Sequence, residues 1–258
     1  MAWVERAAVR FYVERAGSGP VLLYISGTGA DLRVHPTAFD LPFASRFDLV
    51  TYDQRGLGQT DQPPGPYTMA GYADDAATIL DAVGVGQAIV MGVSFGGMVA
   101  QELVLRYPAK VSRLVLASTS SGGAGGSSYP LRELLHFPKA EHAAVRLALT
   151  DSRWEDDTFI DPVRDSTARG FAASGPPTPG ARLQLEARRH HDTHGRLGAI
   201  ECPVLVCAGR YDKIAPPSNA AALASAIPDA RLELFEGGHR FTQQDPRAPE
   251  VIVSILLN

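Results

Sequence analysis

A serine flanked by glycines is the clearest candidate for chemistry in this chain. Ser94 lies at the centre of the run GVSFG, residues 92–96, between a predicted buried strand, 87–93, and a predicted, mostly apolar helix, 95–107. A nucleophile at such a turn takes strained backbone angles, and glycines two residues away on either side relieve the crowding. The pattern predicts a hydroxyl raised above a sheet, with the N–H of Phe95 available to stabilise an oxyanion. A glycine-rich turn without chemistry is the alternative.

A serine hydroxyl is a weak nucleophile at neutral pH and needs a base within hydrogen-bond reach. His239 is the candidate base, because it follows the predicted strand 231–235 in the loop EGGH, just ahead of a predicted closing helix, 249–257. Where the nucleophile lies at such a strand-to-helix turn, the base comes last of the three catalytic residues in the chain. The remaining histidines fit less well, because they lie in predicted loops, helices or a region without strands. They are His35, His136, His142, His190, His191 and His194.

Three of these histidines, His190, His191 and His194, are close together in the sequence. Such a group could ligate a metal, but no set of carboxylates or thiols accompanies it. We therefore expect these side chains to face solvent or to pack against neighbouring segments, and we expect no metal ion and no cofactor.

The acid that orients the base is expected after the preceding strand. Asp212 follows the predicted strand 203–209 directly, in the run AGRYD. Its role would be to fix the histidine tautomer and to stabilise the imidazolium. An ordinary turn aspartate is the alternative. A second arrangement would place the acid after the strand 111–118, but no Asp or Glu occurs there before Glu133.

A second donor to the oxyanion is expected in the loop after the strand 21–25. The run SGTG, residues 26–29, begins there, and the N–H of Thr28 is the candidate donor. Two converging N–H groups are what a tetrahedral intermediate requires. A simple glycine turn is the alternative.

The elements that would position these residues alternate between short apolar runs and helical patterns, which is typical of a parallel α/β sheet. Residues 8–14 alternate in the manner of an edge strand. The other predicted strands are 21–25, 47–53, 87–93, 111–118, 203–209 and 231–235, and the predicted helices are 68–84, 95–107, 218–226 and 249–257.

The alternation stops after the strand 111–118. Residues 118–128 are all Ser, Thr, Gly or Ala and predict a flexible hinge. Residues 129–195 contain helical segments but no convincing strand. We therefore predict one sheet domain with a helical cap inserted after its sixth core strand: residues 1–120 form the first part of the core, 121–198 the cap and 199–258 the second part of the core.

Composition supports a globular protein and excludes some partners. The chain has 258 residues, 45% of them hydrophobic, which suffices for a sizeable core. A net charge of -4 gives no electrostatic footprint for nucleic acid, and no basic run indicates a membrane surface. The charged N-terminal segment does not resemble a signal peptide. In an extended segment Cys202 and Cys207 are too far apart for a disulfide, so we expect a reduced, cytoplasmic protein.

The runs GVSFGG, AGRYD and EGGH, in this order, resemble the α/β-hydrolase superfamily. The run YDQRGLGQTD resembles the arginine-glycine loop found in many members, and HDTHGRLGAIECPVLVCAGRYDKIAPP resembles a subgroup of enol-lactonases, methylesterases and other small cap-bearing hydrolases. The resemblance covers essentially the whole chain outside residues 119–180. The chain departs from most members at Ser26-Gly27, where they have His-Gly. Because the donor in that loop is a backbone amide, the oxyanion hole need not be lost.

This resemblance implies a serine hydrolase that cleaves an ester or lactone of a small molecule, as a monomer or homodimer. A carbon–carbon bond hydrolase of the aromatic-degradation type is one alternative, although such relatives usually have Gly-Asn-Ser where this chain has Gly92-Val93-Ser94. A proline iminopeptidase is another, suggested by the run DQRG at 53–56. A non-catalytic ligand receptor on the same fold is a third. A peptidase would need carboxylates in the cap; those available are Glu133, Glu141, Glu155, Asp156 and Asp157.

Overall fold

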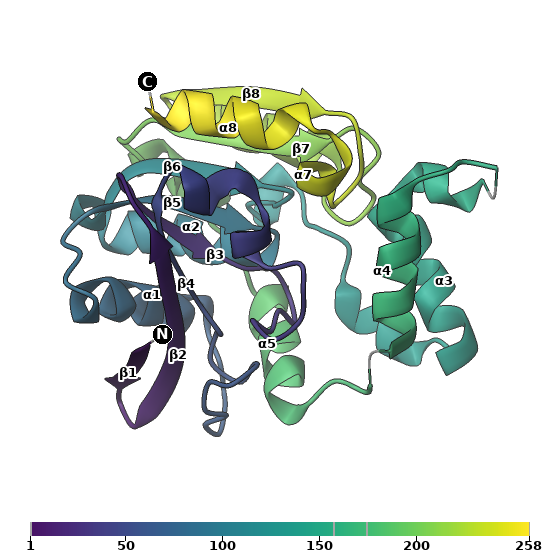
Figure 1. Ribbon diagram of the computed structural model, residues 1–258, viewed down its shortest axis with the longest axis horizontal. Coiled ribbons are helices and arrows are strands. Elements are labelled where there is room, and N and C mark those ends of the chain that lie inside the picture. Colours follow the sequence, from purple (N-terminus) through teal and green to yellow (C-terminus); the bar gives the residue numbers. More distant parts are fainter. Residues whose placement is uncertain (1, 157, 174, 258) are drawn as a thin grey trace.

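A single twisted sheet forms the centre of the molecule in the computed structural model, which describes residues 2–156, 158–173 and 175–257 (Figure 1). The eight strands run in the order β1-β2-β4-β3-β5-β6-β7-β8. Strands β1 and β2 and strands β2 and β4 pair antiparallel, and all other pairs are parallel. The strands are β1 Ala2–Arg6, β2 Val9–Gly17, β3 Val21–Ile25, β4 Asp48–Tyr52, β5 Ala88–Val93, β6 Val111–Ala117, β7 Val204–Gly209 and β8 Ala230–Phe235. This confirms the predicted α/β class with a mostly parallel sheet.

The predicted edge strand is the exception. Strand β2 lies between β1 and β4, and the edge is β1, which the sequence pattern did not single out. Of the five residues in β1 only Val4 is buried, so the strand carries too few apolar residues to be recognised. Its place in the sheet comes from the hairpin with β2, where Val4 faces Phe11. With β1 counted, the strand before the insertion is the sixth.

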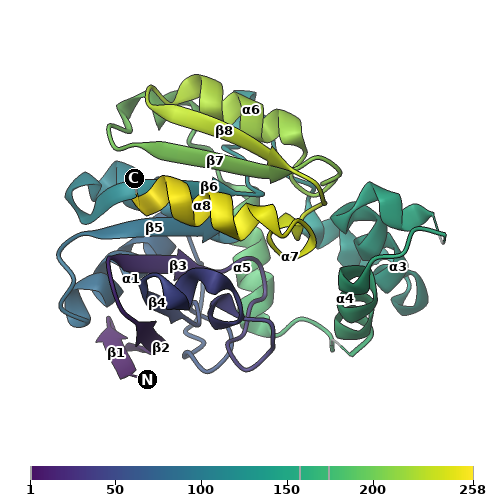
Figure 2. The same cartoon turned by 45° about the horizontal axis from the view of Figure 1, so that its top comes forward.

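Helices cover both faces of the sheet (Figure 2). One face packs against α1 Met69–Ala82, α2 Phe95–Arg106 and α6 Pro217–Ala226. The other face packs against α7 Phe241–Gln244, α8 Arg247–Leu257 and the short 3-10 turns near residues 38–45. Successive strand residues point to opposite faces, so Leu23 contributes to the first core and Leu22 to the second.

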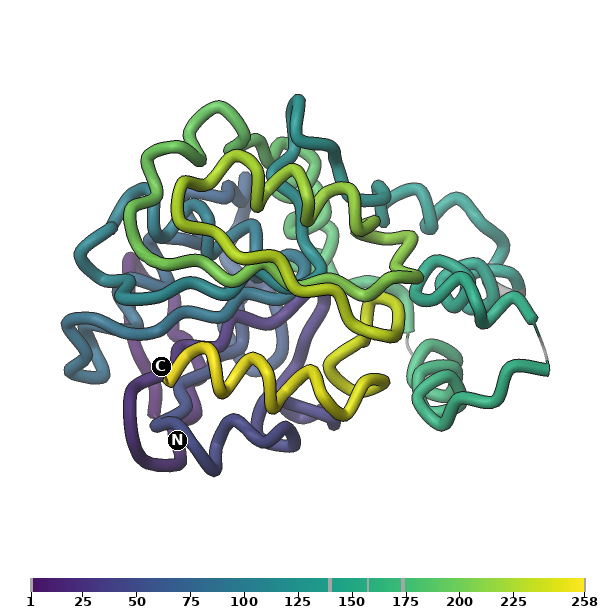
Figure 3. Tube along the Cα trace, turned by 90° about the horizontal axis from the view of Figure 1, so that it is seen from above, coloured from purple at the N-terminus to yellow at the C-terminus, as the bar shows by residue number. Residues whose placement is uncertain are grey.

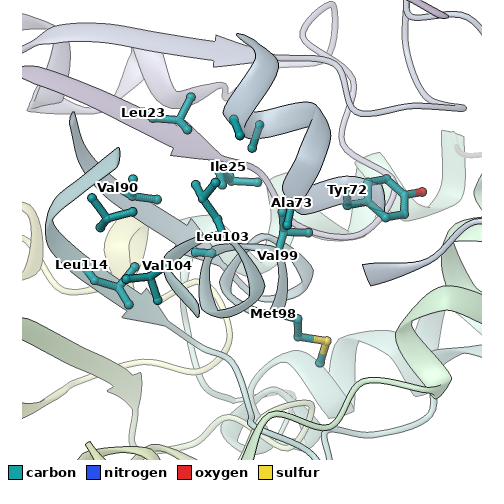
Figure 4. Close-up of a cluster of buried hydrophobic side chains, with 14 of the residues drawn as sticks. Leu23, Ile25, Tyr72, Ala73, Val90, Met98, Val99, Leu103, Val104 and Leu114 are labelled. Atoms are coloured by element: carbon teal, nitrogen blue, oxygen red, sulfur yellow. The ribbon is translucent and has the colours of Figure 1, made fainter. Parts of the chain in front are cut away.

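The helix that follows Ser94 is buried along most of its length. Figure 4 shows Val99, Leu103 and Val104 of α2 among apolar residues of the sheet, such as Val90 and Leu114. A helix that is apolar on nearly all sides can only be stable in the interior. Its N-terminus is therefore held rigidly at the carboxyl edge of the sheet, where parallel α/β folds place their functional loops.

The segment between β6 and β7 is helical. It contains α3 Lys139–Thr150, α4 Pro162–Ala173 and α5 Pro179–Arg189, and its described residues contain no strand. Helices α3 and α4 stand beside the sheet, whereas α5 lies against it (Figures 1 and 3). We refer to residues 121–198 as the insertion; these limits remain a prediction.

The predicted flexible hinge is wrong for its first residues. Residues 118–121 are all at most 3% exposed. The Thr119 hydroxyl donates to the carbonyl of Ser94, and the N–H of Thr193 donates to the carbonyl of Ser121. Small hydroxyl side chains fit a crowded interior when their hydrogen bonds are satisfied, and composition does not distinguish this from a flexible linker.

Two further expectations concern cysteines and membranes. Cys202 and Cys207 are both free thiols, as predicted from their spacing. Among the helices of the described residues, none is both long and apolar enough to cross a bilayer.

Candidate active site

Ser94 begins α2 in a conformation that few residues adopt. Its backbone has φ 55° and ψ −116°, and its N–H donates to the carbonyl of Ala117 across to β6 at 2.8 Å. The two flanking glycines are needed because backbone passes close by. A side chain at Gly92 would collide with the carbonyl of Gly96, and one at Gly96 would collide with the carbonyl of Ile25. The predicted strained strand-to-helix turn is therefore present, and it is tightly packed.

The structure brings Ser94, His239 and Asp212 into one chain of hydrogen bonds. The distance from His239 Nε2 to Ser94 Oγ is 2.9 Å, and that from His239 Nδ1 to Asp212 Oδ2 is 2.7 Å. The other carboxylate oxygen of Asp212 accepts the N–H groups of Ile214 and Ala215 at 2.8 and 2.9 Å. Because a carboxylate only accepts, Nδ1 carries the proton, and the lone pair of Nε2 faces the serine hydroxyl.

The loop that carries His239 rests on the insertion. The N–H of His239 donates to the carbonyl of Thr150, the last residue of α3, at 2.6 Å. The N–H of Gly238 donates to Oε1 of Gln244, whose Nε2 in turn donates to Asp151. The end of α3 therefore helps to fix the position of His239.

The two predicted oxyanion donors lie in segments that adjoin the serine. Phe95 is the first residue of α2, and the loop at 26–29 passes so close that a Cβ on Gly27 would lie 3.4 Å from Cβ of Ser94. Among the described residues the structure gives neither the Phe95 N–H nor the Thr28 N–H an acceptor. Two free N–H groups that converge beside a nucleophile would stabilise an oxyanion, so Phe95 and Thr28 remain the candidate donors.

Sequence analysis missed the side chains that hold the loop at 26–29. Gln54 Nε2 donates to the carbonyl of Ser26 at 2.7 Å, the N–H of Gly29 donates to Oε1 of Gln184 at 2.9 Å, and Arg188 Nη1 donates to Oγ1 of Thr28 at 3.0 Å. Gln184 and Arg188 are four residues apart on α5 and so share one helix face. These three contacts hold the loop in which this chain has Ser26-Gly27 in place of the His-Gly of most family members.

Two other residues of the run DQRG after β4, Asp53 and Arg55, have structural roles. Asp53 accepts the N–H groups of Leu32 and Gln59, and burial raises its pKa. Arg55 pairs with the buried Asp75 of α1 at 2.5 Å. These contacts anchor the loops after β3 and β4 to each other and to the core.

Among the described residues, those of the histidine cluster included, no group of three or more His, Cys, Asp or Glu side chains is arranged to hold a metal ion. His190 is exposed, whereas His191 is 7% exposed and packs against the predicted hinge. The distance from His191 Nε2 to the carbonyl of Ser120 is 3.2 Å. Burial lowers the pKa of His191 to about 4, so the ring is neutral. These observations fit the expected packing role.

The carboxylates that a peptidase would need in the cap were named above as Glu133, Glu141, Glu155, Asp156 and Asp157. Glu133, Glu141, Glu155 and Asp156 are all exposed. Asp157 lies outside the described residues.

Comparison with known proteins decides the family. The family model described as alpha/beta hydrolase fold matches residues 20–245. The chain belongs to this family. This α/β-hydrolase is 25% identical over 234 residues to 3-oxoadipate enol-lactonase 2 of Acinetobacter baylyi, with 89% of this chain and 85% of the relative covered. It is 28% identical over 256 residues to 2-hydroxymuconate semialdehyde hydrolase of Pseudomonas putida, with 92% and 86% covered.

Solved structures agree. The crystal structure of a hydrolase from Pseudomonas aeruginosa superimposes on this α/β-hydrolase with a TM-score of 0.78 and 28% identity, covering 99% of this chain and 96% of the other. The protein is a hydrolase of the α/β-hydrolase family.

Proposed function

We propose that this α/β-hydrolase cleaves a carboxylic ester or lactone of a small molecule through an acyl-enzyme on Ser94. The observation that carries the proposal is the hydrogen-bond chain from Asp212 through His239 to Ser94. A base with its lone pair directed at a serine hydroxyl, and an acid that fixes the tautomer of the base, are what serine nucleophilic catalysis needs.

In the first half of the reaction Oγ of Ser94 bonds to the substrate carbonyl carbon while its proton passes to Nε2 of His239. The carbonyl oxygen gains negative charge and is stabilised by the N–H groups of Phe95 and Thr28. The bond to the leaving oxygen then breaks, and that oxygen takes the proton from His239. In a lactone the released hydroxyl remains attached to the acyl group.

In the second half water attacks the acyl carbon and gives one proton to Nε2 of His239. Collapse of the second tetrahedral intermediate breaks the bond to Oγ, and Ser94 recovers its proton from His239. The carboxylic acid leaves. Asp212 stabilises the imidazolium in both halves and keeps its own charge.

The insertion would act as the cap of this site. Its helix α5 touches the loop at 26–29 through Gln184 and Arg188, and the end of α3 holds the loop of His239. Loops and insertions over a rigid sheet are where specificity is set in such folds.

A carbon–carbon bond hydrolase is the second candidate, because one relative is a 2-hydroxymuconate semialdehyde hydrolase. That reaction would use the same three side chains on a vinylogous ketone. The residue before the serine, Val93, offers no side-chain amide to such a substrate, which favours the ester or lactone.

The test combines labelling and turnover. A fluorophosphonate probe is expected to modify the wild type at Ser94, and p-nitrophenyl esters and small lactones are expected to be hydrolysed. Ser94→Ala is expected to lose both the labelling and the turnover. Turnover of an aryl diketo acid with no ester or lactone hydrolysis would select the carbon–carbon reaction. Absence of labelling, with ligand binding retained, would indicate a receptor.

A further inference from the structure

An arginine without an acidic partner lies beside the proposed reaction centre. Arg188 of α5 is 6% exposed. Its guanidinium donates to Oγ1 of Thr28 at 3.0 Å, to Oγ of Ser128 at 2.7 Å and to the carbonyl of Tyr129 at 3.2 Å. All of these acceptors are neutral. Within the part of the chain that the structure describes, no carboxylate lies within ion-pair distance of Arg188.

The nearby carboxylates are already engaged. Glu186 turns toward Arg132 and Arg189, at 2.6 and 3.7 Å. The charge of Asp212 raises the pKa of Arg188, but the carboxylate itself is hydrogen-bonded to His239. Burial lowers the pKa of Arg188 to about 10, which still leaves the side chain charged. Burying a charge is costly unless an opposite charge accompanies it, so the structure holds a cation whose counter-charge is supplied from elsewhere.

Arg188 also lines a cavity of about 390 Å³. Met98, Leu131 and Leu185 form an apolar part of its wall, and Ser120, Ser128 and His191 contribute polar groups. Arg132, Glu133 and Arg189 also line it, and both of these arginines pair with Glu186. Met98 is one helical turn after Ser94 on α2, and Arg188 contacts the loop of Thr28. The cavity therefore adjoins the proposed site and has the size and mixed lining typical of small-molecule pockets.

A second unsatisfied group faces the same cavity. Because a carbonyl oxygen only accepts, the contact with Ser120 places the proton of His191 on Nε2. Nδ1 of His191 is then an acceptor, and it is buried without a partner in the described chain. Arg188, a cation with no carboxylate partner among the described residues, and the acceptor of His191 thus suit a ligand with an anionic group and a hydrogen-bond donor.

Two more arginines add positive charge at the contact between insertion and core. Arg240, next to His239, donates to Oγ1 of Thr167 on α4 at 3.0 Å, and the guanidinium of Arg146 lies 4.0 Å from the ring centre of Phe171. Among the described residues neither has a carboxylate partner. Burial, and then the charge of Arg240, lower the pKa of Arg146 to about 10. The field around the site favours an anion.

We propose that the cavity beside α5 binds the carboxylate of an acidic substrate through Arg188. The natural ester or lactone then carries a free carboxylate in addition to the carbonyl group that Ser94 attacks. The inference rests on the proposed function. Arg188 is the anchor, the wall of Met98, Leu131 and Leu185 holds the carbon chain, and His191 accepts from a hydroxyl group of the ligand or from a water molecule.

The test compares a matched pair of substrates, p-nitrophenyl hydrogen adipate and its neutral methyl ester. Wild type is expected to favour the acid in kcat/KM by roughly 10- to 100-fold, the scale of a buried charge-assisted pair. Arg188→Met is expected to abolish this ratio, and Arg188→Lys to keep part of it. Arg182→Met is the control, because Arg182 is exposed on the same helix and is not among the residues that line the cavity. The ratio cancels any general loss of rate from the contact with Thr28.

Binding to catalytically inactive protein provides a second readout. Monomethyl adipate is expected to bind Ser94→Ala at least ten times more tightly than dimethyl adipate, and to lose this advantage in Ser94→Ala/Arg188→Met. Equal rates on the two esters, or a preference that survives Arg188→Met, would overturn the inference while leaving ester hydrolysis intact. No Ser94-dependent turnover of either ester would overturn the proposed function instead.

Discussion

At the scale of single residues, the site depends on a serine held in a backbone conformation that a neighbouring strand enforces. Ser94 has positive φ, and its N–H and its carbonyl are bonded to Ala117 and to Thr119 on the β6 side. Such strain persists only where the surroundings over-determine it. Substitutions of the side chain should therefore remove chemistry without releasing the turn.

The three hydrogen-bonded side chains are expected to act as one unit. Ser94→Ala and His239→Ala should each lower kcat by roughly three orders of magnitude or more, and the double variant should be little worse, because either change alone abolishes the proton transfer. Asp212→Asn should also lower kcat steeply by favouring the wrong histidine tautomer. Steady-state kinetics on one p-nitrophenyl ester checks this; losses that multiply in the double variant would contradict a shared unit.

The burial of His191 is expected to make the stability of the protein depend on pH, independently of catalysis. Its folded pKa of about 4 lies below the ordinary value, so the unfolded chain takes up a proton first as the pH falls. The contribution of His191 to the free energy of unfolding should therefore decrease as the pH drops from about 6.5 to about 4, by about 3 kcal/mol at most, and change no further below that. In His191→Gln this component should be absent. Urea unfolding of both proteins at pH 7 and pH 4.5 measures it, and parallel losses would refute it.

At the scale of elements, α5 takes over the support of the loop at 26–29. One face of this helix presents Gln184 to Gly29 and Arg188 to Thr28, while Thr178 caps its N-terminus by accepting from the N–H of Ala181. A helix of the insertion thus sets the position of a proposed oxyanion donor. The insertion is then part of the catalytic geometry as well as a wall of the pocket.

Gln184→Leu is expected to lower kcat by roughly tenfold with little change in KM, because misplacing a donor weakens mainly the transition state. The affinity for a boronic acid analogue should fall by the same factor, which a purely structural role would not require. Since Gln184 Nε2 has no hydrogen-bond partner among the residues that the structure describes, little stability should be lost. Arg182→Ala, exposed on the same helix, is the control. A change confined to KM would show that Gln184 contacts substrate instead.

At the scale of the whole molecule, the insertion is attached to the core unevenly. Helix α5 packs against the sheet domain, and the last turn of α3 accepts N–H groups from Lys213 and His239. Helix α4 reaches the core through side chains, namely Thr167 with Arg240, and it has an exposed neighbour in Ile160, which is 92% exposed. Movement over the site is therefore expected in α4 and not in α5.

Hydrogen exchange tests this division. Amides of 162–173 should exchange at least ten times faster than those of α5 and of residues 118–121, because few buried contacts oppose local opening of α4. An acidic ligand at Arg188 should slow exchange in α5 and its surroundings. Protection of α4 equal to that of β5 would show that the insertion is rigid throughout.

Sequence alone determined the core of this protein because parallel strands leave a readable pattern. Each buried strand is a short apolar run, and its C-terminal end is marked by a change to glycine and polar residues. Ser94, Asp212 and His239 follow three such strands, and parallel strands bring those ends to one edge of the sheet. The convergence of these three side chains could therefore be predicted.

Only the tertiary structure decided what surrounds them. The burial of residues 118–121, the edge position of β1 and the contacts of Gln54, Gln184 and Arg188 depend on which surfaces meet across long separations in the chain. In the sequence Arg188 is one of several arginines near Glu186, and nothing local shows that this carboxylate pairs with the others. An ion pair can be recognised in the sequence only when its two residues are close along the chain. A buried arginine without a carboxylate partner can therefore be identified only in the folded structure.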